Sequence, residues 1–220
     1  MNWQSLFGRA AAVDADEADV SEALARVRGR TESDGYTERD ANRNDDAAES
    51  AAPAPPEPSP ARVVADADVL AADLLVGGRS RAALEALWRH SWTTLVASDA
   101  LLDDAEAVVA DLAEPTDASL AADWRAAVAD WREPVSHPRN DHPALGSAYR
   151  GGAMHVLSLD DRLTSAGAGA ALRDRVPVSV REPRAFAAVF DAERLYPEVR
   201  DGDYPGPDRE PRDGNGESAP

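Results

Sequence analysis

The sequence predicts an α/β fold in three layers, with a central, mostly parallel sheet between two layers of helices. Short β-rich segments alternate with helical segments between residues 62 and 197, and strands that alternate with helices form parallel sheets covered on both faces. The length of 220 residues suits one domain with tails rather than two domains. Stretches rich in acids, proline or glycine flank the alternating region, and we expect disorder in these N- and C-terminal flanks.

Composition divides the chain into four regions. Residues 1–30 place apolar side chains at helical spacing, which predicts a short amphipathic helical segment that docks on the domain or frays in solvent. Residues 31–61 form an acidic, Pro- and Ala-rich stretch that predicts a disordered linker. Residues 62–197 carry the alternating pattern of the domain. Residues 198–220 form an acidic tail without periodicity, for which we expect disorder.

The elements of the domain follow from apolar periodicity and from capping residues. Runs of β-branched and other apolar residues predict the strands, and apolar residues three and four apart predict the helices. Ser98 and Asp99 are typical N-cap residues, and proline begins two of the helices. The expected strands are 62–65, 93–97, 134–136, 154–157 and 176–180. The expected helices are 80–89, 101–112, 120–131, 143–150, 164–173 and 183–190.

The composition excludes several kinds of site. The chain has no cysteine, which excludes a disulfide scaffold, a zinc ribbon, iron–sulfur ligation and a cysteine nucleophile. All 23 basic residues are arginine and stand against 41 acidic residues, so the net charge is −18. This amino-acid composition, without lysine and with more aspartate than glutamate, is typical of an extreme halophile, and we expect an archaeal source. Molar salt screens such a surface, so its acidity does not exclude a nucleic acid partner.

The sequence also indicates where the protein works. No apolar run is long enough to cross a bilayer, and the N-terminus lacks the basic start and apolar centre of a secretion signal. Anionic lipid would repel an amphipathic N-terminal helix with an acidic polar face. We therefore expect a soluble cytoplasmic protein with no membrane partner.

Acidic residues recur where predicted strands end or the next helices begin. Because the carboxyl ends of parallel strands meet at one edge of a sheet, we expect these side chains to share a crevice. Crowded carboxylates repel one another and are typically held by a hard cation such as Mg²⁺ or Mn²⁺. The alternative is that these acids only stabilise helix starts and hold no metal, because aspartate is also favoured at helix N-caps and first turns. The pattern leaves both interpretations open. The acids at these positions are Asp66, Asp68, Asp103, Asp104, Asp141, Asp160 and Asp161.

Five short motifs in the domain occur in the order of a known family. The first follows the opening strand, Val63-Val-Ala-Asp66-Ala-Asp68-Val-Leu, and the second is Leu95-Val-Ala-Ser98-Asp-Ala-Leu-Leu-Asp103-Asp104. The others are Asn140-Asp141-His-Pro-Ala-Leu-Gly, His155-Val-Leu-Ser158-Leu-Asp160-Asp-Arg-Leu163 and Val178-Ser-Val-Arg-Glu-Pro183-Arg-Ala-Phe186. Over residues 62–195 the chain thus resembles the PIN domain, a metal-dependent nuclease fold.

The resemblance implies the residues of a metal site for Mg²⁺ or Mn²⁺. The residues that match the family's catalytic and metal-binding acids are Asp66, Asp104, Asp141 and Asp160. The neighbours expected to support them are Asp68, Ser98, Asp103 and Ser158. The chain departs from the family pattern at three positions. Asp68 stands where asparagine is usual, Leu159 where glycine is frequent, and Asp104 where glutamate is more usual.

The resemblance also implies the activity and the partners. A PIN domain of this kind hydrolyses RNA phosphodiesters with a metal-activated water, so we expect a ribonuclease that acts on RNA. Arg79 and Arg81 follow a Gly-Gly pair and are weak candidates for phosphate contacts near Asp66. The alternative is a catalytically inactive PIN-like module that binds RNA or a protein such as an antitoxin. Both interpretations leave open whether the protein forms a homodimer.

Overall fold

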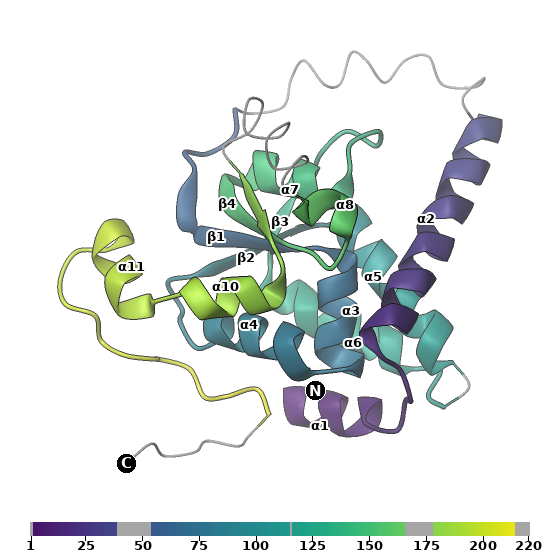
Figure 1. Ribbon diagram of the computed structural model, residues 1–220, viewed down its shortest axis with the longest axis horizontal. Helices are drawn as coiled ribbons and strands as arrows, with labels where there is room; N and C mark the ends of the chain where they lie inside the picture. The colour runs from purple at the N-terminus through teal and green to yellow at the C-terminus, as the bar shows by residue number, and fades with distance from the viewer. Residues whose placement is uncertain (1, 39–53, 115, 166–177, 214–220) are drawn as a thin grey trace.

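The computed structural model describes residues 2–38, 54–114, 116–165 and 178–213, and these residues form an α/β fold (Figure 1). Five strands of the described chain form one sheet in which all neighbouring strands run parallel, with helices on its faces. The predicted fold class is therefore confirmed. The strands are β1 (Ser59–Ala65), β2 (Thr94–Ser98), β3 (Glu133–Val135), β4 (Ala153–Leu157) and β5 (Ser179–Arg181).

The order of the strands in the sheet is β3-β2-β1-β4-β5. The first strand, β1, lies in the middle of the sheet. β2 and β3 follow on one side of it, and the chain then returns to the other side of β1 to form β4 and β5. The order therefore reverses between β1 and β4, whose carboxyl ends pair through Ala65 and Leu157. Ligand crevices of open parallel sheets lie at such a reversal.

Five of the six helices predicted for the domain are present, with bounds that differ from the prediction by at most two residues. Their bounds are α1 (Trp3–Ala10), α2 (Glu17–Glu38), α3 (Ala67–Leu75), α4 (Gly78–Trp88), α5 (Asp99–Ala113), α6 (Leu120–Trp131), α7 (Pro143–Gly151), α8 (Asp161–Thr164), α10 (Pro183–Val189) and α11 (Ala192–Val199). The prediction missed α3 because all nine of its residues are buried, so it shows no amphipathic stripe. Most of the helix predicted at 164–173 lies outside the described residues.

Helices pack on both faces of the sheet. α7 lies against β1, β2 and β4 on one face, whereas α3, α4 and α10 lie together on the other (Figure 1). α7 comes so close to β2 that a β-carbon on Gly151 would stand 2.3 Å from Cγ1 of Val96. The next residue, Gly152, ends α7 with a φ of +61°, a conformation that favours glycine.

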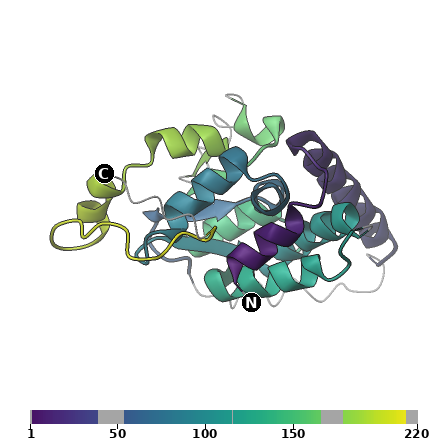
Figure 2. The ribbon, with the colours of Figure 1, turned by 90° about the horizontal axis from the view of Figure 1, so that it is seen from below.

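The N-terminal helices dock on the domain, which was one of the two outcomes expected for residues 1–30. Leu6 of α1 and Val20 of α2 are fully buried. α1 packs against α3 and α6 (Figure 2), and α2 packs against α3 and α5. α2 also continues to Glu38, into the stretch predicted as a linker, and β1 begins at Ser59 within that stretch. Residues 39–53 of the predicted linker lie outside the described residues.

The C-terminal tail differs from the predicted disorder over its described part. Residues 198–213 include the end of α11 and run back along the domain to α1 (Figure 2). The Arg212 side chain is fully buried, and its guanidinium donates to the carboxylate of Asp73 at 2.7 and 3.0 Å. The backbone N–H of Ser91 donates to Asp208 at 2.7 Å. Composition did not predict this docking, because it depends on single ion pairs rather than on an apolar pattern.

None of the helices in the described ranges combines the length and the apolar character that a membrane span requires.

Candidate active site

The ends of β1 and β4 hold buried carboxylates. Asp66 follows β1 and caps α3, where its Oδ1 accepts a hydrogen bond from the backbone N–H of Ala67 at 2.8 Å. Asp68 lies in the first turn of α3, and its Oδ2 accepts from the backbone N–H of Leu159 at 3.0 Å. Oγ of Ser158 lies 3.3 Å from an oxygen of each carboxylate. These bonds join the carboxyl ends of β1 and β4 at the reversal of strand order.

Asp104 of α5 joins this group through Arg28 of α2. Nη2 of Arg28 donates to Oδ1 of Asp66 at 2.7 Å, and Nε of Arg28 donates to Oδ2 of Asp104 at 3.0 Å. Nη1 of the same guanidinium lies 3.3 Å from Nε2 of His142, the residue before α7. One cationic side chain therefore links residues from three separate parts of the domain.

Asp160 lies after β4 and caps α8. Its Oδ1 accepts from the backbone N–H of Arg162 at 2.8 Å, and its Oδ2 accepts from the Arg162 guanidinium at 2.9 Å. Burial alone would raise the pKa of Asp160, but the bonds from Arg162 outweigh it and lower the pKa. Asp160 also interacts electrostatically with Arg28 and His142. We refer to Asp66, Asp68, Asp104 and Asp160 as the acidic cluster.

Burial shifts the pKa values of this site. Burial, and then repulsion by Asp66, raises the pKa of Asp68 to about 8, so this carboxyl is mostly protonated at neutral pH. Burial also raises the pKa of Asp104, although the bond from Arg28 opposes the shift. Burial lowers the pKa of His142, which favours the neutral imidazole. The site therefore holds a protonated carboxyl, Asp68, and a neutral imidazole, His142, among its acids.

Two of the predicted site residues lie away from the cluster, and a third lies near it without bonding to it in the described ranges. Asp141 is exposed in the turn before α7, and its neighbour His142 faces the cluster instead. The Asp103 side chain is 65% exposed and pairs with Arg125 at 2.8 Å, so the structure brings Asp104 rather than Asp103 to the site. Ser98 is buried at the carboxyl end of β2, beside β1, but its Oγ caps α5 and lies 2.9 Å from Nε2 of His137.

The predicted phosphate contacts lie at the other end of α3 from Asp66. The guanidinium of Arg81 donates to the backbone oxygens of Asp73 and Leu74 at 2.6 and 3.0 Å. Arg79 is exposed in the first turn of α4. The expected nearness to Asp66 is not found, because the nine residues of α3, a helix that was not predicted, separate the two places.

The prediction did not find Arg28 or His142. Val20, Leu24 and Val27 gave the apolar spacing of α2, and Arg28 follows Val27 directly, but nothing in the spacing named its partner. The position of His142 beside Asp141 in the third motif is the one sequence feature that points to the site.

Comparison with known proteins identifies a family. The model of a family of unknown function, DUF7384, matches residues 57–212. The chain belongs to this family. No curated protein and no solved structure matches the chain. The DUF7384 match contains the whole acidic cluster and the docked Arg212, but it begins after α2, so Arg28 lies outside it.

The oxygen donors of the DUF7384 domain suit a hard divalent cation. Carboxylate and hydroxyl oxygens, which Mg²⁺ and Mn²⁺ prefer, meet at Asp66, Asp104 and Ser158. Across the described ranges, however, no three His, Asp or Glu side chains converge as metal ligands do. The guanidinium of Arg28 stands between Asp66 and Asp104 and bonds to both. The cluster thus accommodates a cation, and the cation that this structure places there is Arg28.

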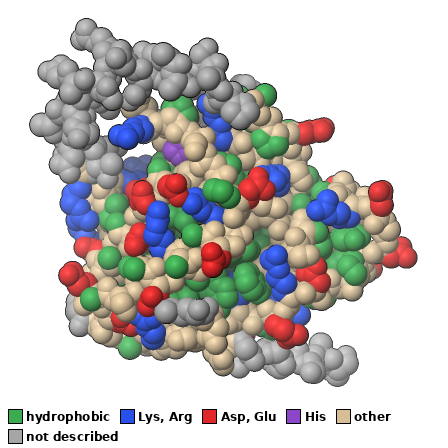
Figure 3. Space-filling model, turned by 180° about the vertical axis from the view of Figure 1, so that it is seen from behind, with side chains coloured by type: hydrophobic (Ala, Val, Ile, Leu, Met, Phe, Trp, Pro, Cys, Tyr) green, Lys and Arg blue, Asp and Glu red, His purple; other side chains and the backbone are tan. Residues whose placement is uncertain are grey.

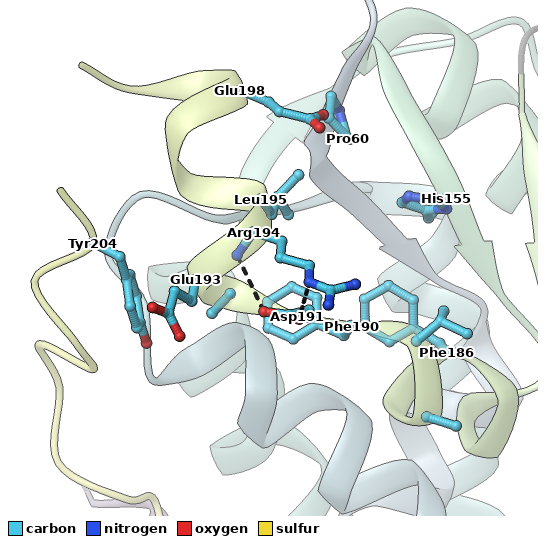
Figure 4. A pocket seen from close by; sticks show the side chains of 13 residues that line it. Pro60, His155, Phe186, Phe190, Asp191, Glu193, Arg194, Leu195, Glu198 and Tyr204 are labelled. Carbon is cyan, nitrogen blue, oxygen red and sulfur yellow. Dashed lines mark hydrogen bonds and ion pairs between the residues drawn. The ribbon is translucent and has the colours of Figure 1, made fainter. Parts of the chain in front are cut away.

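The surface of the DUF7384 domain offers less specific features. Acidic and arginine side chains are interspersed on the face in Figure 3 rather than gathered by sign. A cleft beside α10 and α11 is lined by Phe186, Phe190 and Arg194 (Figure 4). This cleft also includes Pro60 near the amino end of β1, whereas Asp66 follows the carboxyl end of the same strand. The cleft and the acidic cluster therefore lie at opposite ends of β1.

Proposed function

We propose that the DUF7384 domain of this chain is a metal-dependent ribonuclease of PIN type, which hydrolyses RNA phosphodiesters. The observation that carries the proposal is the meeting of Asp66 and Asp104 at the Arg28 guanidinium, at the reversal of strand order. Asp160, which pairs with Arg162, follows β4 at the same edge of the sheet and interacts electrostatically with Arg28. These three residues are among the four that the motifs match to the metal-binding acids of PIN domains, and the fourth, Asp141, is exposed.

Asp66, Asp104 and Asp160 are the side chains that would hold Mg²⁺ or Mn²⁺ in this function. Such an ion lowers the pKa of a bound water and offsets the negative charge that a phosphodiester gains under attack. The chain's own contribution is to orient the carboxylates. Ser158 lies within hydrogen-bonding distance of both Asp66 and Asp68. Asp68 is further held by the backbone N–H of Leu159, so the ends of β1 and β4 keep a fixed spacing.

Cleavage of RNA by the full chain with Mn²⁺ in high salt tests this function. Asp66→Asn, Asp104→Asn and Asp160→Asn each remove one charged oxygen donor. Mutation of residues that merely support metal ligands already lowers activity about 10–100-fold. We therefore expect each variant to lose about 100-fold or more of the RNA-cleaving activity. Asp103→Asn is the matched control, since this neighbour of Asp104 is exposed and pairs with Arg125. If Asp66→Asn and Asp160→Asn cleave RNA as fast as the wild-type protein, the proposal is wrong.

A catalytically inactive PIN-like module that binds RNA or a protein is the second candidate. The position of Arg28 favours it, because a resident guanidinium already balances Asp66 and Asp104. A ligand that binds only the folded state raises its melting temperature. If the chain is a nuclease, Mn²⁺ raises the melting temperature of the wild-type protein more than that of Asp66→Asn. If it is the inactive module, Mn²⁺ raises both melting temperatures equally or not at all.

A further inference from the structure

The N-terminal helix α2 delivers Arg28 to the acidic cluster from outside the matched domain. Its apolar face is anchored on α3 and α5, where Val20, Leu24 and Val27 are at most 6% exposed. Arg28 follows this anchor directly, and 21% of its side chain is exposed. In Figure 1, α2 runs along the side of the domain next to α3 and α5. The helix thus holds the guanidinium at the cluster while leaving the side chain a path to solvent.

The guanidinium takes the place that a bridging metal ion would need. It donates to Oδ1 of Asp66 and to Oδ2 of Asp104, at 2.7 and 3.0 Å. An ion held by both carboxylates would need these same two oxygens as ligands. The positive charge of the guanidinium would also repel the ion at such a short distance. Arg28 and a divalent cation therefore exclude each other at this position.

We propose that Arg28 is a built-in inhibitor of the site, which competes with the divalent cation for Asp66 and Asp104. The proposal rests on the proposed metal-dependent function. Metal binding requires the Arg28 side chain to leave the cluster, and α2 can stay docked because Val20, Leu24 and Val27 carry its packing. Anything that draws Arg28 or α2 away from the cluster raises the affinity for metal.

The neighbouring Arg26 provides a matched control. It lies two residues earlier on α2 and pairs with Asp111 of α5 at 2.7 Å, with half of its side chain exposed. Like Arg28, it joins α2 to α5, but no bond connects it with the acidic cluster within the described ranges. Arg26→Ala therefore removes an ion pair from the same helix interface without uncovering the cluster.

The test is calorimetric titration of the full chain with Mn²⁺, which does not depend on catalysis. If Arg28 occupies the position in nine of ten molecules or more, its removal lowers the apparent Kd at least tenfold. We expect this change in Arg28→Ala, and a change of less than about twofold in Arg26→Ala. Adding Asp66→Asn to Arg28→Ala abolishes the gain, which separates the cluster from Mn²⁺ bound elsewhere on an acidic surface. Arg28→Gln keeps a polar side chain without the charge, so it serves if Arg28→Ala does not fold.

The outcomes separate this proposal from the proposed function. Tight Mn²⁺ binding in Arg28→Ala or Arg28→Gln, with weak or undetectable binding in the wild type, supports it. Equal or weaker binding in both variants, with clear binding in the wild type, overturns the inhibitor and leaves the metal site intact. If neither the wild type nor either variant shows Asp66-dependent binding at millimolar Mn²⁺, both proposals are overturned.

Discussion

Arg212 joins the two ends of the chain, and its removal is expected to destabilise the domain strongly. Its guanidinium donates to Asp73 at 2.7 and 3.0 Å and to Glu85 at 3.0 Å, with no exposed side-chain surface. The same group lies 5.0 Å from the ring centre of Trp3 and 5.4 Å from that of Phe7. A residue from the tail thus contacts α1, α3 and α4 together.

Arg212→Ala leaves the buried carboxylate of Asp73 without its main partner. Breaking a buried ion pair from one side costs about 3–5 kcal/mol, and the lost cation–π contacts add about 1 kcal/mol. For a domain of this size each kcal/mol lowers Tm by roughly 2–4 °C, so we expect a fall of about 10 °C or more. Arg209→Ala is the control, because the Arg209 side chain pairs with no buried carboxylate among the described residues. It lies over Trp88 at 5.2 Å and donates a long bond of 3.4 Å to the Trp88 backbone oxygen, so we expect a loss of about 1 kcal/mol.

Urea denaturation and thermal melting of the full chain measure these changes in the free energy of unfolding. The double variant Asp73→Ala/Arg212→Ala removes both charges, so its loss is expected to fall short of the sum of the two single losses. If Arg212→Ala is as stable as Arg209→Ala, the tail does not dock as described, and the buried ion pair contributes nothing to stability.

Two further variants test the site and the sheet. The pKa of Asp68 is about 8 in the fold against a reference value of 3.8, so the folded chain holds an extra proton over this range and its free energy of unfolding falls as the pH rises. In Asp68→Asn we expect this fall to be smaller, by up to roughly 1.4 kcal/mol per pH unit. Urea denaturation at each pH measures the free energy of unfolding, and parallel plots of it against pH for the wild type and the variant would contradict the raised pKa. Gly151→Ala places a β-carbon 2.3 Å from Val96, so we expect a loss of about 1–3 kcal/mol that Val96→Ala partly restores. An unchanged Tm in Gly151→Ala alone is the result that argues against close packing of α7 on β2.

The pattern of apolar residues predicted the sheet well, for a physical reason. The buried strands are short continuous apolar runs such as Val63–Ala65 and Leu95–Ala97, and each is followed by a residue that caps a helix. The helices α3 and α11 of the domain escaped prediction. α11 buries none of its residues and contains Pro197, and proline inside a helical pattern usually ends the helix. α3 lies between two packed layers and is buried all round. A periodicity argument requires one polar face, so it cannot find such a helix.

The contacts made by single arginines could not be predicted in the same way. All 23 basic residues are arginine, and Arg28 and Arg212 have no local feature that separates them from the exposed ones. Both are placed by residues far away in the sequence, Arg28 by Asp66 and Asp104, and Arg212 by Asp73. Strand ends marked the acids of the site, whereas the cation among them depends on how α2 docks.

The neighbours Asp141 and His142 show how one position changes the charge of the site. In extended backbone, successive side chains point to opposite sides, and His142 has such a conformation before α7. Only one of the two can face the cluster, and a motif does not say which. Because His142 faces it with a lowered pKa, the site has one carboxylate fewer than the motifs imply. Arg28 bonds to the carboxyl groups of both Asp66 and Asp104. A guanidinium carries one positive charge and a divalent ion carries two, which gives the ion an electrostatic advantage at these two groups once Arg28 moves away.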